Sequence, residues 1–169
     1  MIGIDIIDLS DPLIKSRGKR SLQLILHKSD WYPKDTNSFW LLWAAKEAVF
    51  KCYRKTERFS PTDIPIKISY LSTQSFRFSS GNITGRLYQT RHYVLAYCGS
   101  NGLPEYSLYF SSFKADSSFI RKKIKLQFPE FEIVHDKNKL PLLSSLNIPL
   151  SISHHGQYAA FAIDVTNIS

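Results

Sequence analysis

The pattern of apolar and polar positions predicts an N-terminal strand followed by helices. Residues 2–9 are rich in isoleucine and predict a buried strand. Residues 13–29 carry apolar side chains at helical spacing, although Gly18 interrupts them. After the helix-capping cluster 35–38, the pattern predicts the strongest helix of the chain at about 39–55. Because this helix is apolar around most of its circumference, we expect it to be largely buried.

The rest of the chain is predicted to be rich in strands. Apolar and polar residues alternate over 64–70, and turn signals lie at Gly81-Asn82 and at 100–102. We find no internal repeat and no clear domain boundary. We therefore expect one α+β domain over 1–169, with an antiparallel sheet, a long packed helix and a β-rich variable segment at about 71–135. Further strands are predicted at 86–97, 106–113, 131–134, 148–153 and 158–165, a helix at 115–128 with its N-cap at Asp116 or Ser117, and a loop at 136–146.

Composition adds a strong positive charge to this picture. The chain has 169 residues and a formal net charge of +8, with basic residues concentrated in 15–20, 46–58 and 114–125. Such a surface attracts anions, including nucleic acids, acidic proteins and phosphorylated cofactors, and equally suits a plain solvated face. The two cysteines, Cys52 and Cys98, have no metal-binding spacing, so we expect buried reduced thiols. There is no apolar run of membrane-spanning length and no signal-peptide pattern, so we expect a cytoplasmic protein.

Two acidic residues stand in apolar surroundings. Asp5 lies in the predicted buried strand, where a carboxylate needs backbone N–H groups, a basic side chain or a bound cation as partner. Glu47 lies on the predicted central helix, where Trp43, Glu47, Lys51 and Arg54 share one face. The spacing of Glu47 and Lys51 suits either an ordinary surface salt bridge or a functional site.

A third polar stretch, 151–155, reads Ser-Ile-Ser-His-His and lies where a strand meets a turn. Ser and His side chains there could hydrogen-bond a phosphate, or the histidines could be exposed turn residues. The sequence contains no Gly-rich nucleotide loop, no Walker loop and no nucleophile elbow.

Taken in order, these stretches resemble the motifs of the 4'-phosphopantetheinyl transferase superfamily. The motifs here are Gly-Ile-Asp at 3–5, Trp-x-x-Lys-Glu-Ala-x-x-Lys at 43–51 and Ser-x-Ser-His at 151–154, with Ala-x-Ala at 160–162. The resemblance covers about 1–70 and 136–165, includes Leu140-Pro141 as a similar loop, and suits the single-repeat class similar to holo-acyl-carrier-protein synthases. The chain departs from that class at Leu42 and Asp11, where the class carries basic residues, and 39–43 is similar to the larger, pseudo-dimeric class.

The resemblance implies an enzyme that transfers the 4'-phosphopantetheine moiety of coenzyme A to a serine of an apo acyl carrier protein, releasing 3',5'-ADP in a Mg²⁺-dependent reaction of the kind used in fatty acid biosynthesis. It implies Asp5 and Glu47 as metal ligands and, together with Lys51, as catalytic residues. It implies Lys46, Lys51, Ser153 and His154 as coenzyme A ligands. Asp8, where relatives carry an acidic residue, is kept as a further carboxylate that would lie just outside the metal ligands.

The resemblance also implies partners. Members of the single-repeat class form trimers with sites between subunits, so a homo-oligomer, with a trimer favoured, would complete the site. The carrier protein is expected to be acidic and to meet residues 15–20 and 51–58. One alternative is a non-catalytic module that binds coenzyme A or a carrier protein. Another is a basic nucleic-acid-binding domain, but no nucleic-acid motif is present, so we expect neither nucleic acid nor membrane as a partner.

Overall fold

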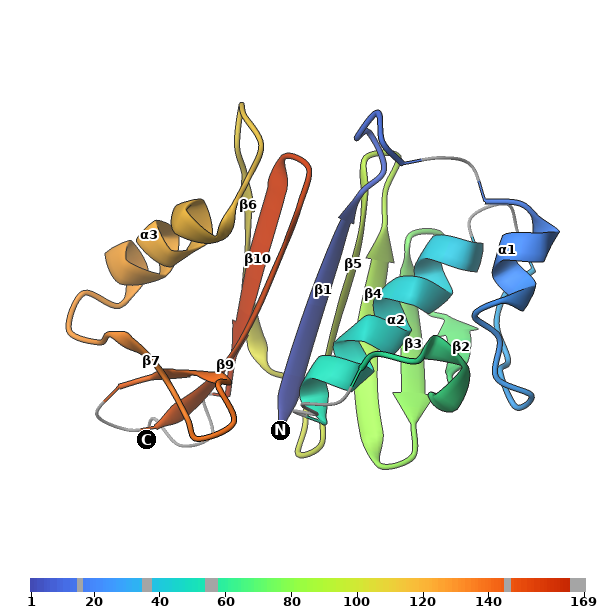
Figure 1. Cartoon of the computed structure of the whole chain (residues 1–169). Coiled ribbons are helices and arrows are strands. Elements are labelled where there is room, and N and C mark those ends of the chain that lie inside the picture. The colour runs from blue at the N-terminus through green and yellow to red at the C-terminus, as the bar shows by residue number, and fades with distance from the viewer. Residues whose placement is uncertain (15–16, 35–37, 54–57, 145–146, 165–169) are drawn as a thin grey trace.

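The fold consists of two five-stranded antiparallel sheets with helices packed on them (Figure 1). The computed structural model describes residues 1–14, 17–34, 38–53, 58–144 and 147–164. The predicted α+β class with antiparallel strand pairing is therefore confirmed, but the strands form two sheets rather than one. None of the helices in these ranges has the length and apolar character needed to span a membrane.

The first unit begins with a buried strand and a helix that covers its sheet. The strand order of its sheet is β1-β5-β4-β3-β2, so the first strand of the unit pairs with the last. The elements are β1 (Ile2–Asp8), α1 (Lys19–Gln23), α2 (Ser38–Cys52), a 3₁₀ turn (Pro61–Asp63), β2 (Lys67–Tyr70), β3 (Ser75–Ser80), β4 (Ile83–Gln89) and β5 (Tyr93–Gly99).

The second unit repeats this arrangement. Its sheet has the order β6-β10-β9-β8-β7, and again a helix follows the first strand and the last strand pairs with the first. The prediction of no internal repeat is therefore wrong at the level of topology. Strand order depends on which faces are buried and which strands pair, so two units can share a strand order without sharing residues. The elements are β6 (Glu105–Phe110), α3 (Ser117–Gln127), β7 (Ile133–His135), β8 (Pro141–Leu143), β9 (Ile148–His155) and β10 (Tyr158–Ile163).

The predicted elements differ from the observed ones at several boundaries. Within 13–29 the described residues are α-helical only over α1, because that stretch lacks a continuous apolar stripe to bury. The single strand predicted at 86–97 is two strands, since Thr90 Oγ1 accepts hydrogen bonds from the N–H groups of His92 and Tyr93 and closes a turn. Part of the predicted loop 136–146 forms β8. Asp116 caps α3 as predicted, accepting the Phe119 N–H at 2.8 Å.

Helix α2 lies directly against β1, backbone to backbone. A Cβ atom on Gly3 would lie 1.9 Å from the Ala48 carbonyl oxygen and 2.7 Å from the Cys52 nitrogen, so only glycine fits there. This close approach places the polar face of α2 beside Asp5 of β1. Both cysteines are buried and free, as predicted.

The two units meet along β1, which is an edge strand of the first sheet. A shared apolar cluster of Ile2, Ile4, Ile6, Leu95, Tyr97, Ala160 and Ala162 fills the space between the sheets. The backbone N–H groups on the free edge of β1 donate to side chains of β9, in the place of a strand partner. These bonds run from Ile4 to Ser151 (3.1 Å), from Ile6 to Ser153 (3.2 Å) and from Asp8 to His155 Nδ1 (3.2 Å). We call this row of bonds the β1–β9 seam.

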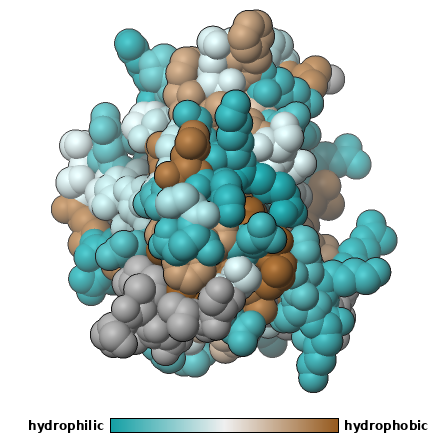
Figure 2. Space-filling view, turned by 90° about the vertical axis from the view of Figure 1, so that its left-hand side faces the viewer, coloured by the Kyte–Doolittle hydropathy of each residue, from teal (hydrophilic) through white to brown (hydrophobic). Residues whose placement is uncertain are grey.

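The far side of the second unit is covered by α3. Ile120 and Ile124 of α3 are buried against the second sheet, while Arg121 and Lys122 are exposed. Figure 2 shows this face, on which hydrophilic side chains predominate. The helix therefore buries one stripe and leaves its basic side to solvent.

Candidate active site

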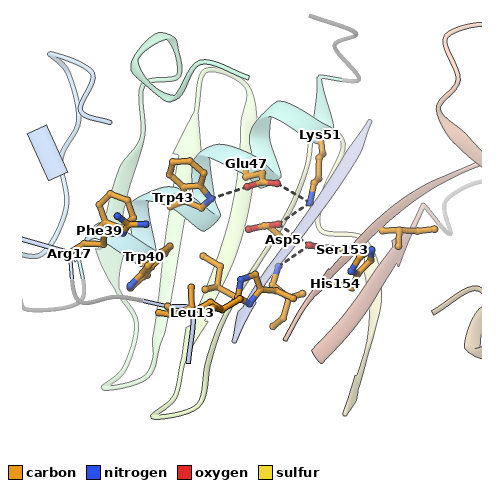
Figure 3. Close-up of a pocket in the computed structure, with 15 residues that line it drawn as sticks. Asp5, Leu13, Arg17, Phe39, Trp40, Trp43, Glu47, Lys51, Ser153 and His154 are labelled. Atoms are coloured by element: carbon orange, nitrogen blue, oxygen red, sulfur yellow. Dashed lines mark hydrogen bonds and ion pairs between the residues drawn. The ribbon is translucent and has the colours of Figure 1, made fainter. Parts of the chain in front are cut away.

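A cavity of about 540 Å³ opens where α2, β1 and β9 converge (Figure 3). One part of its wall is polar and the other is apolar and aromatic. The polar part is formed by Asp5, Glu47, Lys51, Ser153 and His154, and the apolar part by Leu13, Ile14, Phe39, Trp40 and Trp43, with Arg17 beside them. Residues from both units and from widely separated parts of the chain therefore line one cavity.

The ammonium group of Lys51 joins the two carboxylates predicted to form the site. Its Nζ lies 2.8 Å from Asp5 Oδ1 and 3.6 Å from Glu47 Oε1, and it donates to the Ile4 carbonyl at 3.1 Å. Trp43 Nε1 donates to the other oxygen of Glu47 at 2.9 Å. One helical face thus presents Trp43, Glu47 and Lys51 to β1, as their spacing on the helix requires.

The electrostatics of this cluster favour a further cation. Burial raises the pKa of Glu47, and the nearby Asp5 raises it further, against the opposing effects of Lys51 and Trp43. Burial acts to lower the pKa of Lys51, but Asp5 and Glu47 outweigh it, so the pKa is raised. Lys51 therefore stays protonated, and two carboxylates face its single positive charge.

Ser153 and His154 occupy different positions in the cavity wall, although they are adjacent in sequence. Ser153 is buried, donates to Asp5 Oδ1 at 2.8 Å and accepts the Ile6 N–H at 3.2 Å. His154 is exposed at the rim. Partial burial lowers the pKa of His154, and the positive charges of Lys51 and Lys114 lower it further, which outweighs the attraction of Asp116. His154 is thus the member of the pair that is open to a ligand from solvent.

The structure does not support Lys46 as a coenzyme A ligand. Its side chain is fully buried on the other side of α2, away from the cavity. Its ammonium contacts Asp30 Oδ2 at 2.7 Å and donates to the carbonyls of Ile64 at 2.6 Å and Pro61 at 2.9 Å. A phosphate could reach this group only if the core opened.

Asp8 also has a structural role instead of the one expected near a metal. Its Oδ1 accepts the Ser10 N–H at 2.8 Å, and its Oδ2 accepts the Gln157 N–H at 2.9 Å. Gly156 packs against this carboxylate so closely that a Cβ would lie 2.2 Å from Oδ2. Asp8 therefore fastens the turn between β9 and β10 and does not line the cavity.

The aromatic end of the cavity was not anticipated from the sequence. The guanidinium of Arg17 lies 5.6 Å from the ring centroids of both Phe39 and Trp40, a cation–π arrangement. A second cavity of about 190 Å³ lies on the other side of Lys51, and its wall includes Phe50 and Pro141. The signals in the sequence were the basic run around Arg17 and the aromatic run 39–43, but nothing in the pattern placed them at a common site.

The donor set fits a hard divalent cation such as Mg²⁺. Within the described ranges no group of three or more His, Cys, Asp or Glu side chains could hold a metal ion. Asp5 and Glu47 supply two carboxylates beside the cavity, and Mg²⁺ is commonly bound by one or two carboxylates while it keeps water and phosphate ligands. A structural zinc site, which needs four protein ligands, does not fit these residues.

A family model described as the 4'-phosphopantetheinyl transferase superfamily matches residues 1–98, more than half of the chain. The chain belongs to this superfamily. The resemblance found in the sequence is thereby confirmed, and with it membership in a family of transferases that use coenzyme A and act on carrier proteins. The matched residues contain Asp5, Glu47 and Lys51 and end within β5, so the second unit lies outside the match. No curated protein and no solved structure matches the chain.

Proposed function

We propose that this protein transfers the 4'-phosphopantetheine moiety of coenzyme A to a serine of an acyl-carrier-type protein and releases 3',5'-ADP. The observation that carries this proposal is the convergence of Asp5, Glu47 and Lys51 in one cavity wall, within the part of the chain that matches the family. These groups suit phosphoryl transfer because they provide a carboxylate pair for Mg²⁺ and the ammonium of Lys51 for phosphate oxygens.

Asp5 and Glu47 are the residues that would hold Mg²⁺. When bound, the ion neutralises charge on the pyrophosphate of coenzyme A and orients it. Lys51 would donate to a pyrophosphate oxygen and stabilise the departing 3',5'-ADP, since its ammonium already lies between the two carboxylates. Glu47, or a water held at the same site, would accept the proton of the attacking serine hydroxyl.

His154 would bind a phosphate of coenzyme A at the rim of the cavity. It is exposed, and Lys114 lies close enough to influence its pKa. A neutral imidazole can donate one hydrogen bond to phosphate, and an incoming dianion would favour its protonated form. Lys51 and His154 are therefore the proposed coenzyme A ligands, and Lys46 is not among them.

The carrier protein would dock beside the aromatic end of the cavity. Arg17, Lys19 and Arg20 are the described basic residues of the first expected docking segment, and Arg17 lines the cavity itself. Acidic carrier surfaces would be drawn to this side by electrostatic attraction, which accelerates association and weakens as salt is added. Half of the second expected segment, residues 54–57 of 51–58, lies outside the described residues.

A single chain supplies the complete proposed site. The expectation of a trimer was based on a neighbouring subunit completing the site, but β9 of the same chain brings Ser153 and His154 to Asp5. The second unit takes the place that another subunit would fill in a single-repeat enzyme. We therefore propose that the monomer is sufficient for activity.

The test is the intact mass of an apo acyl carrier protein after incubation with the protein, coenzyme A and Mg²⁺. The proposal predicts a mass gain of one phosphopantetheine on the carrier and its loss with Glu47→Gln. Coenzyme A binding without a mass gain on any of several apo carriers would instead support a non-catalytic binding module.

A further inference from the structure

We propose that Ser153 is a positioning residue that fixes the orientation of Asp5, rather than a ligand of coenzyme A. This inference rests on the proposed function in one respect, namely that Asp5 holds a divalent cation. It assigns to the second unit a direct part in building the metal site of the first.

The Ser153 hydroxyl is fully engaged within the protein. Its Oγ donates its only hydrogen to Asp5 Oδ1 at 2.8 Å and accepts the Ile6 N–H at 3.2 Å. The side chain is almost completely buried, with 6% of the residue exposed. To donate to a phosphate, Ser153 would have to release the Asp5 carboxylate, which is itself only 3% exposed and costly to leave unpaired.

The bonds to Asp5 fix one carboxylate oxygen and leave the other available. Oδ1 receives the hydroxyl of Ser153 and the ammonium of Lys51, both at 2.8 Å. No described residue donates a hydrogen bond to Oδ2, and Asp5 lines the cavity. Two donors on Oδ1 hold the carboxylate plane, so Oδ2 is the oxygen presented to a cation. Outer partners of this kind commonly determine how well a ligating carboxylate binds its metal.

Ser153 reaches Asp5 because of the β1–β9 seam. The seam aligns β9 with β1 so that alternate side chains of β9 meet alternate N–H groups of β1. Figure 3 shows Ser153 extending from its strand to Asp5 on the neighbouring strand. The orientation of Asp5 that we infer therefore depends on the docking of the second unit.

The seam also contains a matched control. Ser151 lies two residues earlier on β9, is equally buried at 6%, and accepts the Ile4 N–H at 3.1 Å. It makes the same kind of seam bond as Ser153, but no described contact joins it to Asp5. Ser151→Ala and Ser153→Ala thus each remove one comparable seam bond, and only the second removes a partner of Asp5.

The experiment measures Mn²⁺ binding to the purified full chain by electron paramagnetic resonance, without coenzyme A or carrier. We expect Ser153→Ala to weaken Mn²⁺ binding by about 10- to 100-fold. Ser153→Thr, which keeps the hydroxyl, should restore most of the affinity, and Ser151→Ala should bind within about threefold of the wild type. Thermal unfolding should show both alanine variants folded, with Ser153→Ala the less stable of the two because it also removes a donor to the buried Asp5. Coenzyme A affinity, measured by calorimetry without metal, should be unchanged in Ser153→Ala.

Three results would overturn the inference. One is an unchanged Mn²⁺ affinity in Ser153→Ala together with weakened coenzyme A binding, which would make Ser153 a coenzyme A ligand. Another is an equal loss of Mn²⁺ affinity in Ser151→Ala, which would mean that the effect comes from weakening the β1–β9 seam and not from the bond to Asp5. The third is a wild-type protein that binds no Mn²⁺. If the contrast holds but no carrier gains mass, the transferase proposal fails and the role of Ser153 stands.

Discussion

Removal of the side-chain charge should have different effects at two lysines of the same helical motif. Lys46 and Lys51 are five residues apart on α2, but Lys46 is fully buried against Asp30 whereas the Lys51 side chain is a quarter exposed in the cavity wall. Replacing each by methionine keeps an unbranched, largely apolar side chain and deletes the ammonium. We expect Lys46→Met to lose stability and Lys51→Met to lose transfer.

The cost at Lys46 follows from what its ammonium leaves behind. Asp30 keeps the N–H groups of Ile66 at 2.7 Å and His27 at 2.9 Å but loses its cation, and the carbonyls of Pro61 and Ile64 lose their donor. Removing one partner of a buried ion pair costs about 3–5 kcal/mol. Burial lowers the pKa of Lys46 and Asp30 offsets only part of this, so the pair adds little by itself. The cost arises because Asp30 remains buried without its partner.

The assay is urea unfolding followed by circular dichroism, with intact-mass transfer measured on the same samples. A loss of about 3–5 kcal/mol is a large part of the roughly 5–15 kcal/mol that typically stabilises a domain. Lys51→Met should lose less, because Asp5 keeps the Ser153 hydroxyl and the site is open to water. An unfolding free energy for Lys46→Met within about 1 kcal/mol of the wild type would refute the assignment of Lys46 to the core.

Three further predictions concern packing, pH and docking. Gly3→Ala should push α2 away from β1, which destabilises the fold by about 1–3 kcal/mol and slows transfer. Gly18→Ala, whose Cβ would meet nothing within 4 Å, should change neither stability nor transfer rate. Equal losses of stability in urea unfolding would contradict this prediction. Burial raises the pKa of Tyr97, and the hydrogen bond with Tyr88 raises it further. The folded protein therefore keeps a proton that the unfolded chain loses above about pH 10, so the free energy of unfolding should fall as pH rises above that value. In Tyr97→Phe this fall should be less steep. Arg17→Glu should raise the KM for an acidic carrier roughly tenfold, and by more than it raises the KM for coenzyme A, which would occupy the same cavity. Lys122→Glu on exposed α3 should change neither KM. A carrier KM that is unchanged in Arg17→Glu would contradict the proposed docking side.

The clustering of Asp5, Glu47 and Lys51 at the candidate site could be expected from the sequence because local spacing and the family motifs agree there. Glu47 and Lys51 share a helical face whatever the rest of the fold does. Asp5 was predicted through the motif, and its meeting with Lys51 depends on the contact between Gly3 and Ala48. Small residues on a helix indicate that a neighbour can come close, but they do not indicate which residue it meets, so the pairing of Gly3 with Ala48 could not be predicted.

The remaining features depend on tertiary structure that the pattern does not encode. Lys46 is adjacent to Glu47 in sequence, but one step around the helix turns it towards Asp30 and the 3₁₀ turn. The family resemblance implied Ser153 as a coenzyme A ligand, and its hydrogen bond to Asp5 across the β1–β9 seam could not be inferred from the alternation of β9. The likeness of the two units was not visible in the sequence, because strand order is set by burial and strand pairing and does not require matching residues.

The most direct test of the account is the rate at which an apo carrier protein gains phosphopantetheine when each carboxylate is changed in turn. Asp5→Asn and Glu47→Gln should each reduce the initial rate by about 10²- to 10³-fold or more, with circular dichroism unchanged, because each removes one of the two charges that face Lys51. A carrier that gains no mass with the wild-type protein, or gains it at an undiminished rate with either variant, would contradict the account.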